Sequence, residues 1–486
     1  MSAEIRTLEP KAVWEYFYQL TQIPRPSKHE AQSIEFAKKF GESLGLETIV
    51  DEVGNVIIRK PATPGYENLK GVIFQGHLDM VPQANSDSTH DFTKDPIDAY
   101  IDGDWVTAKG TTLGADNGIG VATAMAILAS KDIKHGPVEA LFTIDEETGM
   151  SGAFALKPGV LKGDILMNMD SEDEGELYVG CAGGIDGSFY FEIKHDAVPA
   201  GFKAFQLVLK GLKGGHSGVD INLERGNANK IMFRFIKQAT ENLGMRIGSV
   251  GCGNLRNAIP REGFATVIVP TEKVNEFNES LKRFEAIIKN EYSGVETNFS
   301  FEAKPTEMPE KIITLDLQKR LTKAINGCMN GVIRMSQDMI GLVETSSNLA
   351  IVKFDDNKIS VHCLLRSSVD SAKEDLANSI GSIFDLAGAK LVFEGAYPGW
   401  KPNMQSEILK TMQETYKKMT GKIPEIKAIH AGLECGLLGG VYPHWDMISF
   451  GPTIRFPHSP DEKVHIESVQ RFYNWLVETL KNVPVK

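Results

Sequence analysis

Three apolar runs in the first part of the chain each end in charged or imidazole side chains. The run 71–76 is followed by His77 and Asp79. The run 138–144 is followed by Glu146 and Glu147, and the run 165–169 is followed by Asp170. Each run has the length of a buried strand, and stretches long enough for helices separate them. This order predicts an α/β fold, with an open sheet whose ligand site lies beyond the carboxyl ends of its strands. A fourth run, 446–450, precedes His458 and is expected to return to the same sheet.

Helical periodicity marks segments that would pack around this sheet. Apolar side chains recur at helical spacing in residues 8–23, at Val13, Trp14, Phe17, Leu20 and Ile23. A proline-containing segment ends this predicted helix, and a second helix is expected over 30–44. Residues 48–58 predict a hairpin with its turn near Gly54. Asp116 precedes an alanine-rich stretch of high helix propensity, so we place it where a loop joins a helix.

Between residues 186 and 397 the pattern changes to alternating apolar and polar positions. Strands of a half-exposed sheet are predicted at 205–209, 264–268, 358–365 and 389–393, and amphipathic helices at 273–290 and 371–386. A weak repeat is present, because segments beginning at Asn257 and Ser347 are each followed by strand, helix and strand. We therefore predict an inserted α+β lid domain of two similar halves over 186–397, between domain segments 1–185 and 398–486. Chance recurrence of the strand-helix-strand order is the alternative.

Composition and charge narrow the class of partner. With 486 residues the chain is too long for one ordinary core, and 42% hydrophobic with 24% charged residues is typical of globular proteins. Its net charge of −12 argues against nucleic acid or an anionic membrane as the main partner and leaves small molecules. We see no signal peptide and no apolar run that could span a bilayer, so we expect a cytoplasmic protein. The five cysteines lie far apart, and we interpret them as buried thiols.

The polar residues at the predicted strand ends form a donor set that suits metal ions. They are His77, Asp79, Asp116, Glu146, Glu147, Asp170 and His458. Imidazoles and carboxylates without thiolates suit zinc, cobalt or manganese. So many carboxylates at one sheet edge would repel one another without a cation. The residues therefore indicate either a dinuclear metal hydrolase or an acidic rim whose members do not converge, and His77 alone could be a satisfied buried histidine.

Motifs around these residues resemble those of the metallopeptidase family that includes carnosinases, peptidase T, acetylornithine deacetylase and glutamate carboxypeptidase. They are Gly76-His-Leu-Asp79, Gly114-Ala-Asp-Asn-Gly118, Asp145-Glu-Glu-Thr-Gly149 and the distal His458. Further stretches are similar to the bacterial aminoacyl-histidine dipeptidases of that family. These are Gly180-Cys-Ala-Gly-Gly184, Leu212-Lys-Gly-Gly-His-Ser-Gly218, Leu255-Arg-Asn-Ala-Ile-Pro260, Tyr397-Pro-Gly-Trp400, Ile429-His-Ala-Gly-Leu-Glu-Cys435 and Gly451-Pro-Thr453.

The resemblance implies a zinc-peptidase catalytic domain with a central mixed sheet, and it implies roles for the residues at the strand ends. His77 and Asp170 would bind one zinc ion, Glu147 and His458 a second, and Asp116 would bridge the two. Asp79 would support His77 from behind, and Glu146 would be the general base.

In the lid, the resemblance implies that His216 stabilises the oxyanion. Asn257 and Arg366 of the lid, together with Gly432 of the catalytic domain, would hold the carboxylate end of a dipeptide. From the residues alone, Arg366 could instead form an ordinary surface ion pair, and His216 could be a loop histidine between glycines.

The function that the resemblance implies is hydrolysis of unblocked dipeptides, preferentially Xaa-His and including the β-alanyl-histidine type. The protein would be a cytoplasmic homodimer that uses a metal-activated water, with two zinc ions per chain that cobalt or manganese can replace. Two alternatives stay open. One is an amidohydrolase that acts on N-acyl amino acids with the same metals. The other is a catalytically silent, metal-stabilised binding protein, against which the presence of Glu146 argues.

Overall fold

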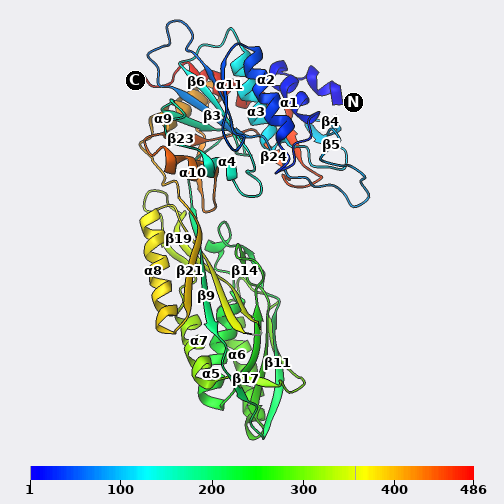
Figure 1. Cartoon of the computed structure of the whole chain (residues 1–486), viewed down its shortest axis with the longest axis vertical. Helices are drawn as coiled ribbons and strands as arrows, with labels where there is room; N and C mark the ends of the chain where they lie inside the picture. The colour runs from blue at the N-terminus through cyan, green and yellow to red at the C-terminus, as the bar shows by residue number, and fades with distance from the viewer. Residues whose placement is uncertain (1, 356) are drawn as a thin grey trace. The chain divides into compact units, whose positions relative to one another are not determined.

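The computed structural model describes residues 2–355 and 357–486, and the chain divides into two compact units (Figure 1). Unit 1 consists of Met1–Gly180, Pro402–Ala428 and Leu433–Lys486. Unit 2 consists of Cys181–Lys401 together with the short segment Ile429–Gly432. Segments from both halves of the sequence therefore build unit 1. No helix in the described part of the chain is long and apolar enough to cross a membrane.

A mixed eight-stranded sheet forms the centre of unit 1. In sheet order its strands are β1 (Glu47–Val50), β2 (Val56–Lys60), β6 (Val138–Thr143), β3 (Val72–His77), β7 (Ile165–Asn168), β23 (Asp446–Ser449), β8 (Glu176–Cys181) and β22 (Glu425–Ile429). The four strands β6, β3, β7 and β23 run parallel to one another. Their carboxyl ends therefore meet at one edge of the sheet. The predicted hairpin and all four predicted apolar strands, including the late return of β23, are confirmed.

Helices cover this sheet, and β3 shows how the two faces differ. The helices of unit 1 are α1 (Lys11–Thr21), α2 (Ala31–Ser43), α3 (Ala115–Ala129), α4 (Ser151–Ala155), α9 (Glu407–Thr420), α10 (Glu434–Val441) and α11 (Ile466–Leu480). On one face a Cβ at Gly76 would lie 2.2 Å from Oδ1 of Asn117 in α3, so this position requires glycine. Gln75 and His77, two residues apart, point to the other face. There Nε2 of Gln75 donates to Glu434 at the start of α10.

The first predicted helix is shorter than expected. The pattern predicted helix over 8–23, whereas α1 begins at Lys11 after Pro10 and ends at Thr21. Proline is favourable only at the start of a helix, because it has no N–H to donate in the interior. The predicted core positions Val13, Trp14, Phe17 and Leu20 are nevertheless buried.

A small sheet beside the central one positions the segment around His458. Its strands, in order, are β24 (Ile454–Arg455), β25 (Lys463–His465), β5 (Trp105–Ala108) and β4 (Ala99–Asp102). His458 lies in the connection between β24 and β25, with a positive φ of 60°. His465 accepts a hydrogen bond from the Ser468 N–H at the start of α11 (Ile466–Leu480).

Unit 2 is built from two halves with the same strand order, as the sequence repeat predicted. The first half contains β11 (Phe202–Lys210), α5 (Ala228–Leu243), β13 (Arg246–Cys252), β15 (Gly263–Pro270), α6 (Val274–Glu291) and β16 (Ser300–Pro305). The second contains β9 (Gly183–Glu192), α7 (Leu315–Gly327), β19 (Val343–Phe354), β20 (Lys358–Ser367), α8 (Asp370–Leu386) and β21 (Lys390–Tyr397). The sheet order is β16-β11-β15-β13-β19-β20-β9-β21. From the outer edge of the sheet inward, the strands of each half lie in the order fourth, first, third and second, where these numbers give their order along the chain.

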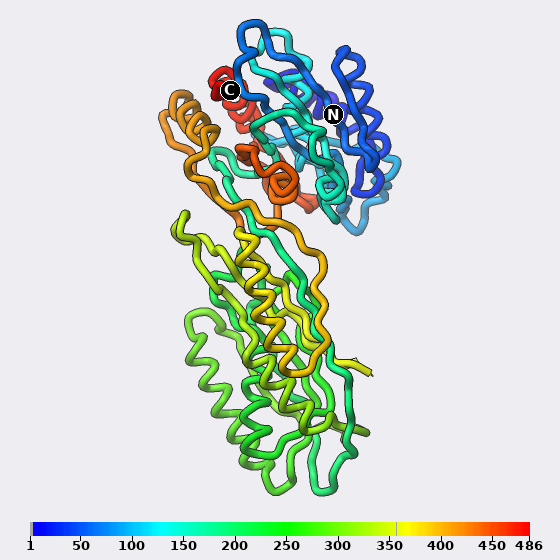
Figure 2. Tube along the Cα trace, turned by 60° about the vertical axis from the view of Figure 1, so that its left-hand side comes forward, coloured from blue at the N-terminus to red at the C-terminus, as the bar shows by residue number. Residues whose placement is uncertain are grey.

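The two halves share one core and one continuous sheet. They join where β13 pairs antiparallel with β19, with Gly251 opposite Lys353 and Cys252 opposite Val352. Helices α5 to α8 lie along the strands (Figures 1 and 2), and their apolar side chains pack with those of the strands in a single cluster. Phe235 of α5 contacts the rings of Phe277, Phe284 and Phe301 at its centre. All five cysteines of the chain are buried, as predicted.

Candidate metal centre

The carboxyl ends of β3 and β7 bring His77 into contact with two carboxylates. Nε2 of His77 lies 3.2 Å from Oδ1 of Asp116 and 3.2 Å from Oδ1 of Asp170. His77 is the last residue of β3, Asp170 follows β7, and Asp116 lies in the first turn of α3, at the predicted junction of loop and helix. One ligand atom from each of the three lies within 4.8 Å of the others.

A second group of the same kind lies beside the first and shares Asp116 with it. Nε2 of His458 lies 2.9 Å from Oε2 of Glu147 and 3.4 Å from Oδ2 of Asp116. The two oxygens of Asp116 therefore face different imidazoles, Oδ1 toward His77 and Oδ2 toward His458. The His458 side chain is 53% exposed, which leaves an entry path for an ion. The structure thus brings all five sequence-predicted ligands together.

Asp79 supports His77 and also fixes the two glutamates beside it. Its Oδ1 lies 3.3 Å from Nδ1 of His77, on the far side of the ring from Asp116. The same carboxylate accepts hydrogen bonds from the backbone N–H groups of Glu146 and Glu147, at 3.1 and 3.2 Å. The sequence predicted the first contact but not the second. Because both amides are held by one side chain, Glu146 and Glu147 have fixed positions relative to His77.

Crowding of charge at this edge changes the acidity of its members. Burial, reinforced by the charges of Glu434 and Glu147, raises the pKa of Glu146 to about 8, although His77 opposes this. Hydrogen bonds to Asp116 and Glu147 raise the pKa of His458 to about 11. Burial alone would lower the pKa of His77, but the carboxylates of Asp170 and Asp116 raise it well above its usual value. Protons therefore compensate the excess negative charge where no cation does so.

The donor set fits two divalent cations. Oε1 of Glu147 is buried without a hydrogen-bond donor, which is costly for a carboxylate oxygen unless a positive group binds it. Imidazole nitrogens and carboxylate oxygens are the ligands of catalytic zinc sites. Asp79, which holds His77 through Nδ1, is the kind of supporting carboxylate that orients a metal-binding histidine.

Two further residues, Glu462 and Arg25, hold the loop that carries Asp116. The carboxylate of Glu462 accepts hydrogen bonds from the consecutive backbone N–H groups of residues 113–116. Arg25 donates to the backbone carbonyl oxygens of Leu78, Asp79 and Gly114. Neither residue was predicted from the sequence, because their partners are backbone atoms that leave no side-chain pattern. Two features of the sequence could have drawn attention to them: Glu462 lies four residues after His458, and Arg25 lies between two prolines.

In unit 2 the structure places His216 beside Asn257. Gly215–His216 pairs with Ala258–Ile259, and the backbone N–H of Ser217 donates to the carbonyl oxygen of Asn257. Nδ1 of His216 accepts hydrogen bonds from the N–H groups of Gly218 and Val219, both at 3.1 Å. Burial and nearby Arg366 lower the pKa of His216. The ring is therefore neutral, and this hydrogen-bond pattern places its proton on Nε2, where it can be donated.

Arg366 lies in β20, 5% exposed, close to Tyr397 and the segment Ile429–Gly432. Its Nη1 donates to the hydroxyl of Tyr397 at 3.0 Å, and its Nε has no acceptor. A Cβ at Gly432 would lie 3.1 Å from the same tyrosine ring. Within the described residues Arg366 forms no ion pair with a carboxylate, so the surface ion pair left open above is not observed.

His430 lies in the same part of unit 2 and is also buried. Its Nε2 lies 2.7 Å from the hydroxyl of Ser346. Burial lowers the pKa of His430 to about 3, and Arg366 acts in the same direction. His430 is therefore neutral, whereas the nearby Arg366 carries a positive charge.

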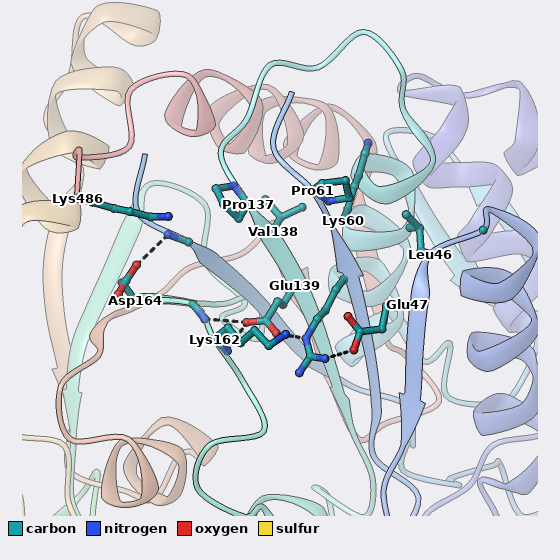
Figure 3. Close-up of a pocket in the computed structure, with 14 residues that line it drawn as sticks. Leu46, Glu47, Lys60, Pro61, Pro137, Val138, Glu139, Lys162, Asp164 and Lys486 are labelled. Atoms are coloured by element: carbon teal, nitrogen blue, oxygen red, sulfur yellow. Dashed lines mark hydrogen bonds and ion pairs between the residues drawn. The ribbon is translucent and has the colours of Figure 1, made fainter. Parts of the chain in front are cut away.

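A separate pocket of about 410 Å³ lies at the opposite edge of the central sheet (Figure 3). It is formed around the amino-terminal ends of β3 and β6, with Val138 and Gly71 among its lining residues. Of its acidic side chains, Glu47 and Glu139 pair with Arg59, and Glu139 also accepts hydrogen bonds from the backbone N–H groups of residues 162 and 163. Because Glu47 and Glu139 are paired with Arg59 and the lining contains no histidine or cysteine, the pocket is not a candidate for the catalytic centre.

The chain is similar to known peptidases over its whole length. The model of peptidase family M20/M25/M40 matches residues 73–482. The cytosol non-specific dipeptidase of Escherichia coli K12 is 48% identical over 484 residues and covers 100% of both chains. The crystal structure of aminoacylhistidine dipeptidase from Vibrio alginolyticus has 51% identity and a TM-score of 0.96, again over 100% of both chains. The aminopeptidase PepT of Bacillus cereus shares only the fold, with 17% identity and a TM-score of 0.56 over 98% of this chain and 99% of its own. The chain belongs to peptidase family M20/M25/M40.

Proposed function

We propose that the protein is a dinuclear zinc dipeptidase that hydrolyses unblocked dipeptides, preferentially Xaa-His. One observation carries this proposal: Asp116 offers one oxygen to the His77 and Asp170 group and the other to the His458 and Glu147 group. A carboxylate in this position is suited to bridge two cations. The names of the two full-length relatives, a non-specific dipeptidase and an aminoacylhistidine dipeptidase, support the substrate class.

The residues at the sheet edge would hold two zinc ions in this proposal. His77 and Asp170 would bind one, Glu147 and His458 the other, and Asp116 both. Two bound cations supply Lewis acidity, which lowers the pKa of water and polarises a carbonyl oxygen. The buried Oε1 of Glu147, which lacks a hydrogen-bond donor, supports these assignments.

Glu146 is the general base of the proposed reaction. Its backbone is fixed by Asp79 next to Glu147, and one of its oxygens belongs to a group with His77 and Glu147 in which all ligand atoms lie within 4.8 Å. A carboxylate held there takes a proton from the attacking water and passes it to the leaving amine. The neighbouring Glu147 keeps its side chain on the His458 side, so adjacent residues carry separate tasks.

Unit 2 supplies groups suited to the substrate's carbonyl and carboxylate. The neutral ring of His216, with its proton on Nε2, is a donor suited to a developing oxyanion, and such a donor contributes about 3 kcal/mol. Arg366 is a buried guanidinium without an anionic partner in the described residues, and its planar fork matches a terminal carboxylate. Asn257 and Gly432 complete the proposed carboxylate-binding set.

Release of free histidine from an Xaa-His dipeptide tests the proposal. We expect cleavage by the zinc-loaded protein, loss of cleavage after chelation, and recovery when zinc is added back. N-acetylhistidine is the matched blocked substrate and should remain intact, which separates a dipeptidase from an N-acyl amidohydrolase. No release of histidine with zinc present, or cleavage of the blocked substrate alone, would overturn the proposal.

Location and assembly are part of the same proposal. The name of the Escherichia coli relative includes the word cytosol, which supports a cytosolic location for this chain. We also propose a homodimer. Sedimentation velocity of the purified full chain tests the second point, with a single species of twice the 53.4 kDa chain mass as the expected result.

A further inference from the structure

The carboxylate of Glu462 binds four consecutive backbone N–H groups. Its Oε2 accepts from Leu113 and Gly114 at 2.7 and 3.0 Å, and its Oε1 accepts from Ala115 and Asp116 at 2.8 and 3.2 Å. The amides of Ala115 and Asp116 belong to the first turn of α3, where N–H groups have no partner within the helix. The Glu462 residue is only 2% exposed, so water does not compete for these amides. One side chain therefore fixes the backbone of the whole Asp116 loop.

Arg25 holds the same loop from the other side. It is also 2% exposed, and its guanidinium donates to the carbonyl oxygens of Leu78 and Asp79, just after β3, and of Gly114. A Cβ at Gly114 would lie 2.5 Å from Nη2 of this arginine, and one at Gly118 would lie 2.8 Å away. The two glycines that bracket Asp116 in the sequence thus make room for the guanidinium. Arg25 thereby ties the loop to the strand that ends in His77.

The segment that carries Glu462 also carries His458. The backbone N–H of Glu462 donates to the carbonyl oxygen of Ser459 at 2.9 Å, and the hydroxyl of Thr107 donates to the Glu462 carbonyl oxygen at 2.7 Å. Residues 458–462 therefore form a short anchored connection. The imidazole at one end of it contacts the Asp116 side chain, and the carboxylate at the other end binds the Asp116 backbone.

We propose that Glu462 is a positioning residue that directs the two oxygens of Asp116 toward separate cation sites. This inference rests on the proposed function, because it takes Asp116 as the ligand shared by both sites. Glu462 itself belongs to none of the groups of ligand atoms found among the described residues. Its effect is on geometry: if the loop rotates, Oδ1 and Oδ2 cannot face His77 and His458 together.

An uncharged replacement cannot reproduce this arrangement. Glutamine has nearly the same shape as glutamate, but its NH2 group would face two of the four N–H donors instead of accepting from them. Glu462→Gln therefore keeps the packing and removes half of the acceptors. Loss of a supporting group of this kind costs 10- to 100-fold in metal affinity. Both cation sites should be affected, since both use Asp116.

The test is zinc affinity of the full chain, measured by competition with a chromophoric chelator. We expect Glu462→Gln to bind both zinc ions roughly 10- to 100-fold more weakly than the parent. Circular dichroism of the metal-free proteins should show the same folded spectrum. The cobalt-substituted variant should also show a changed visible absorption spectrum, because a rotated Asp116 changes the ligand geometry. A merely structural role of Glu462 would leave this spectrum unchanged.

Glu139→Gln is the matched control. Glu139 is likewise a buried carboxylate of unit 1 that binds backbone N–H groups, but at the opposite edge of the same sheet (Figure 3). We expect it to lose stability without a change in zinc affinity. Equal losses of affinity in both variants would overturn the inference, because they would reflect general destabilisation.

The remaining outcomes are also decisive. If the parent binds no zinc, the proposed metal centre fails and this inference fails with it. If the parent binds two zinc ions and folded Glu462→Gln binds them equally well, only the inference fails. Should Glu462→Gln not fold, Arg25→Lys tests the same loop, since lysine cannot span the three carbonyl oxygens. A folded Arg25→Lys variant with weakened zinc affinity supports the inference, and one with unchanged affinity overturns it.

Discussion

Glu146 and Glu147 are consecutive residues to which we assign different tasks, and substitution separates these. Glu146→Gln removes the proposed base and leaves all five proposed ligands in place. We expect turnover to fall by about 10²- to 10⁴-fold while two zinc ions per chain are retained, because general-base catalysis contributes about that factor. Steady-state kinetics and metal analysis of the same sample provide the check.

Glu147→Gln is the companion variant at the neighbouring position. It should lose zinc, because Oε2 of Glu147 is the oxygen that faces His458 at 2.9 Å. If Glu146→Gln loses zinc and Glu147→Gln retains it, Glu146 is the ligand and Glu147 the base, which is the reverse of our assignment.

The histidines of the centre make zinc binding depend on pH. The pKa of His458 is raised to about 11 and that of His77 well above its usual value, so both rings are protonated at neutral pH in the metal-free chain. Zinc requires neutral imidazole and must displace these protons. Affinity should therefore rise with pH across pH 6 to 8, by roughly tenfold per unit for each proton released.

Calorimetric titration in buffers of different ionisation enthalpy measures the number of protons released on zinc binding. A value near zero at pH 7 would contradict protonated histidines in the metal-free centre. The His465→Gln variant is a useful control, because that imidazole caps α11 and should not contribute to the count.

At the scale of elements, the strands and their terminal residues were predictable and the contacts between loops were not. Each apolar run carries its own polar residue at its end, so His77 and Asp170 follow directly from strands β3 and β7. Asp79, Glu462 and Arg25 act mainly on backbone N–H and carbonyl groups of other segments. Backbone groups are the same in every residue, so the sequence contains no pattern that marks such partners.

The close approach of β3 and α3 predicts a specific sensitivity at Gly76. A Cβ at this position would meet Oδ1 of Asn117 at 2.2 Å, and Asn117 is itself held by a hydrogen bond to the carbonyl oxygen of Met169. The neighbour cannot retreat without losing that bond. We therefore expect Gly76→Ala to destabilise unit 1 by about 1–3 kcal/mol, the usual cost of overpacking.

Chemical denaturation of the metal-free protein measures this effect without interference from ligand binding. Gly294→Ala is the control, because a Cβ there has no atom within 4 Å. Its free energy of unfolding should change by less than about 0.5 kcal/mol. Equal stability of the Gly76→Ala protein and the parent would show that α3 can shift away from the strand.

At the scale of the whole molecule, the chain combines two units that have different architectures. Parallel strands in unit 1 gather polar residues at one edge, whereas unit 2 repeats one arrangement of strands and helices and joins the copies through β13 and β19. The repeat was predictable because each half has the same succession of elements. The position of β9 was not predictable, because this strand precedes the whole first half in the sequence but belongs to the second half in the sheet.

All five proposed zinc ligands belong to unit 1, so metal should stabilise that unit selectively. A ligand that binds only the folded state adds about 4 kcal/mol when its free concentration is 1,000 times its Kd. Differential scanning calorimetry of the full chain should therefore show one transition that moves to lower temperature on chelation and another that does not.

Phe235→Ala identifies the second transition, because it removes a fully buried ring from the core of unit 2 at a cost of about 3–5 kcal/mol. His458→Ala removes a ligand of one of the two proposed zinc ions and should reduce the metal-dependent shift of the first transition. A chelator effect on the transition that Phe235→Ala moves, with the other transition unchanged, would contradict the placement of the metal centre in unit 1.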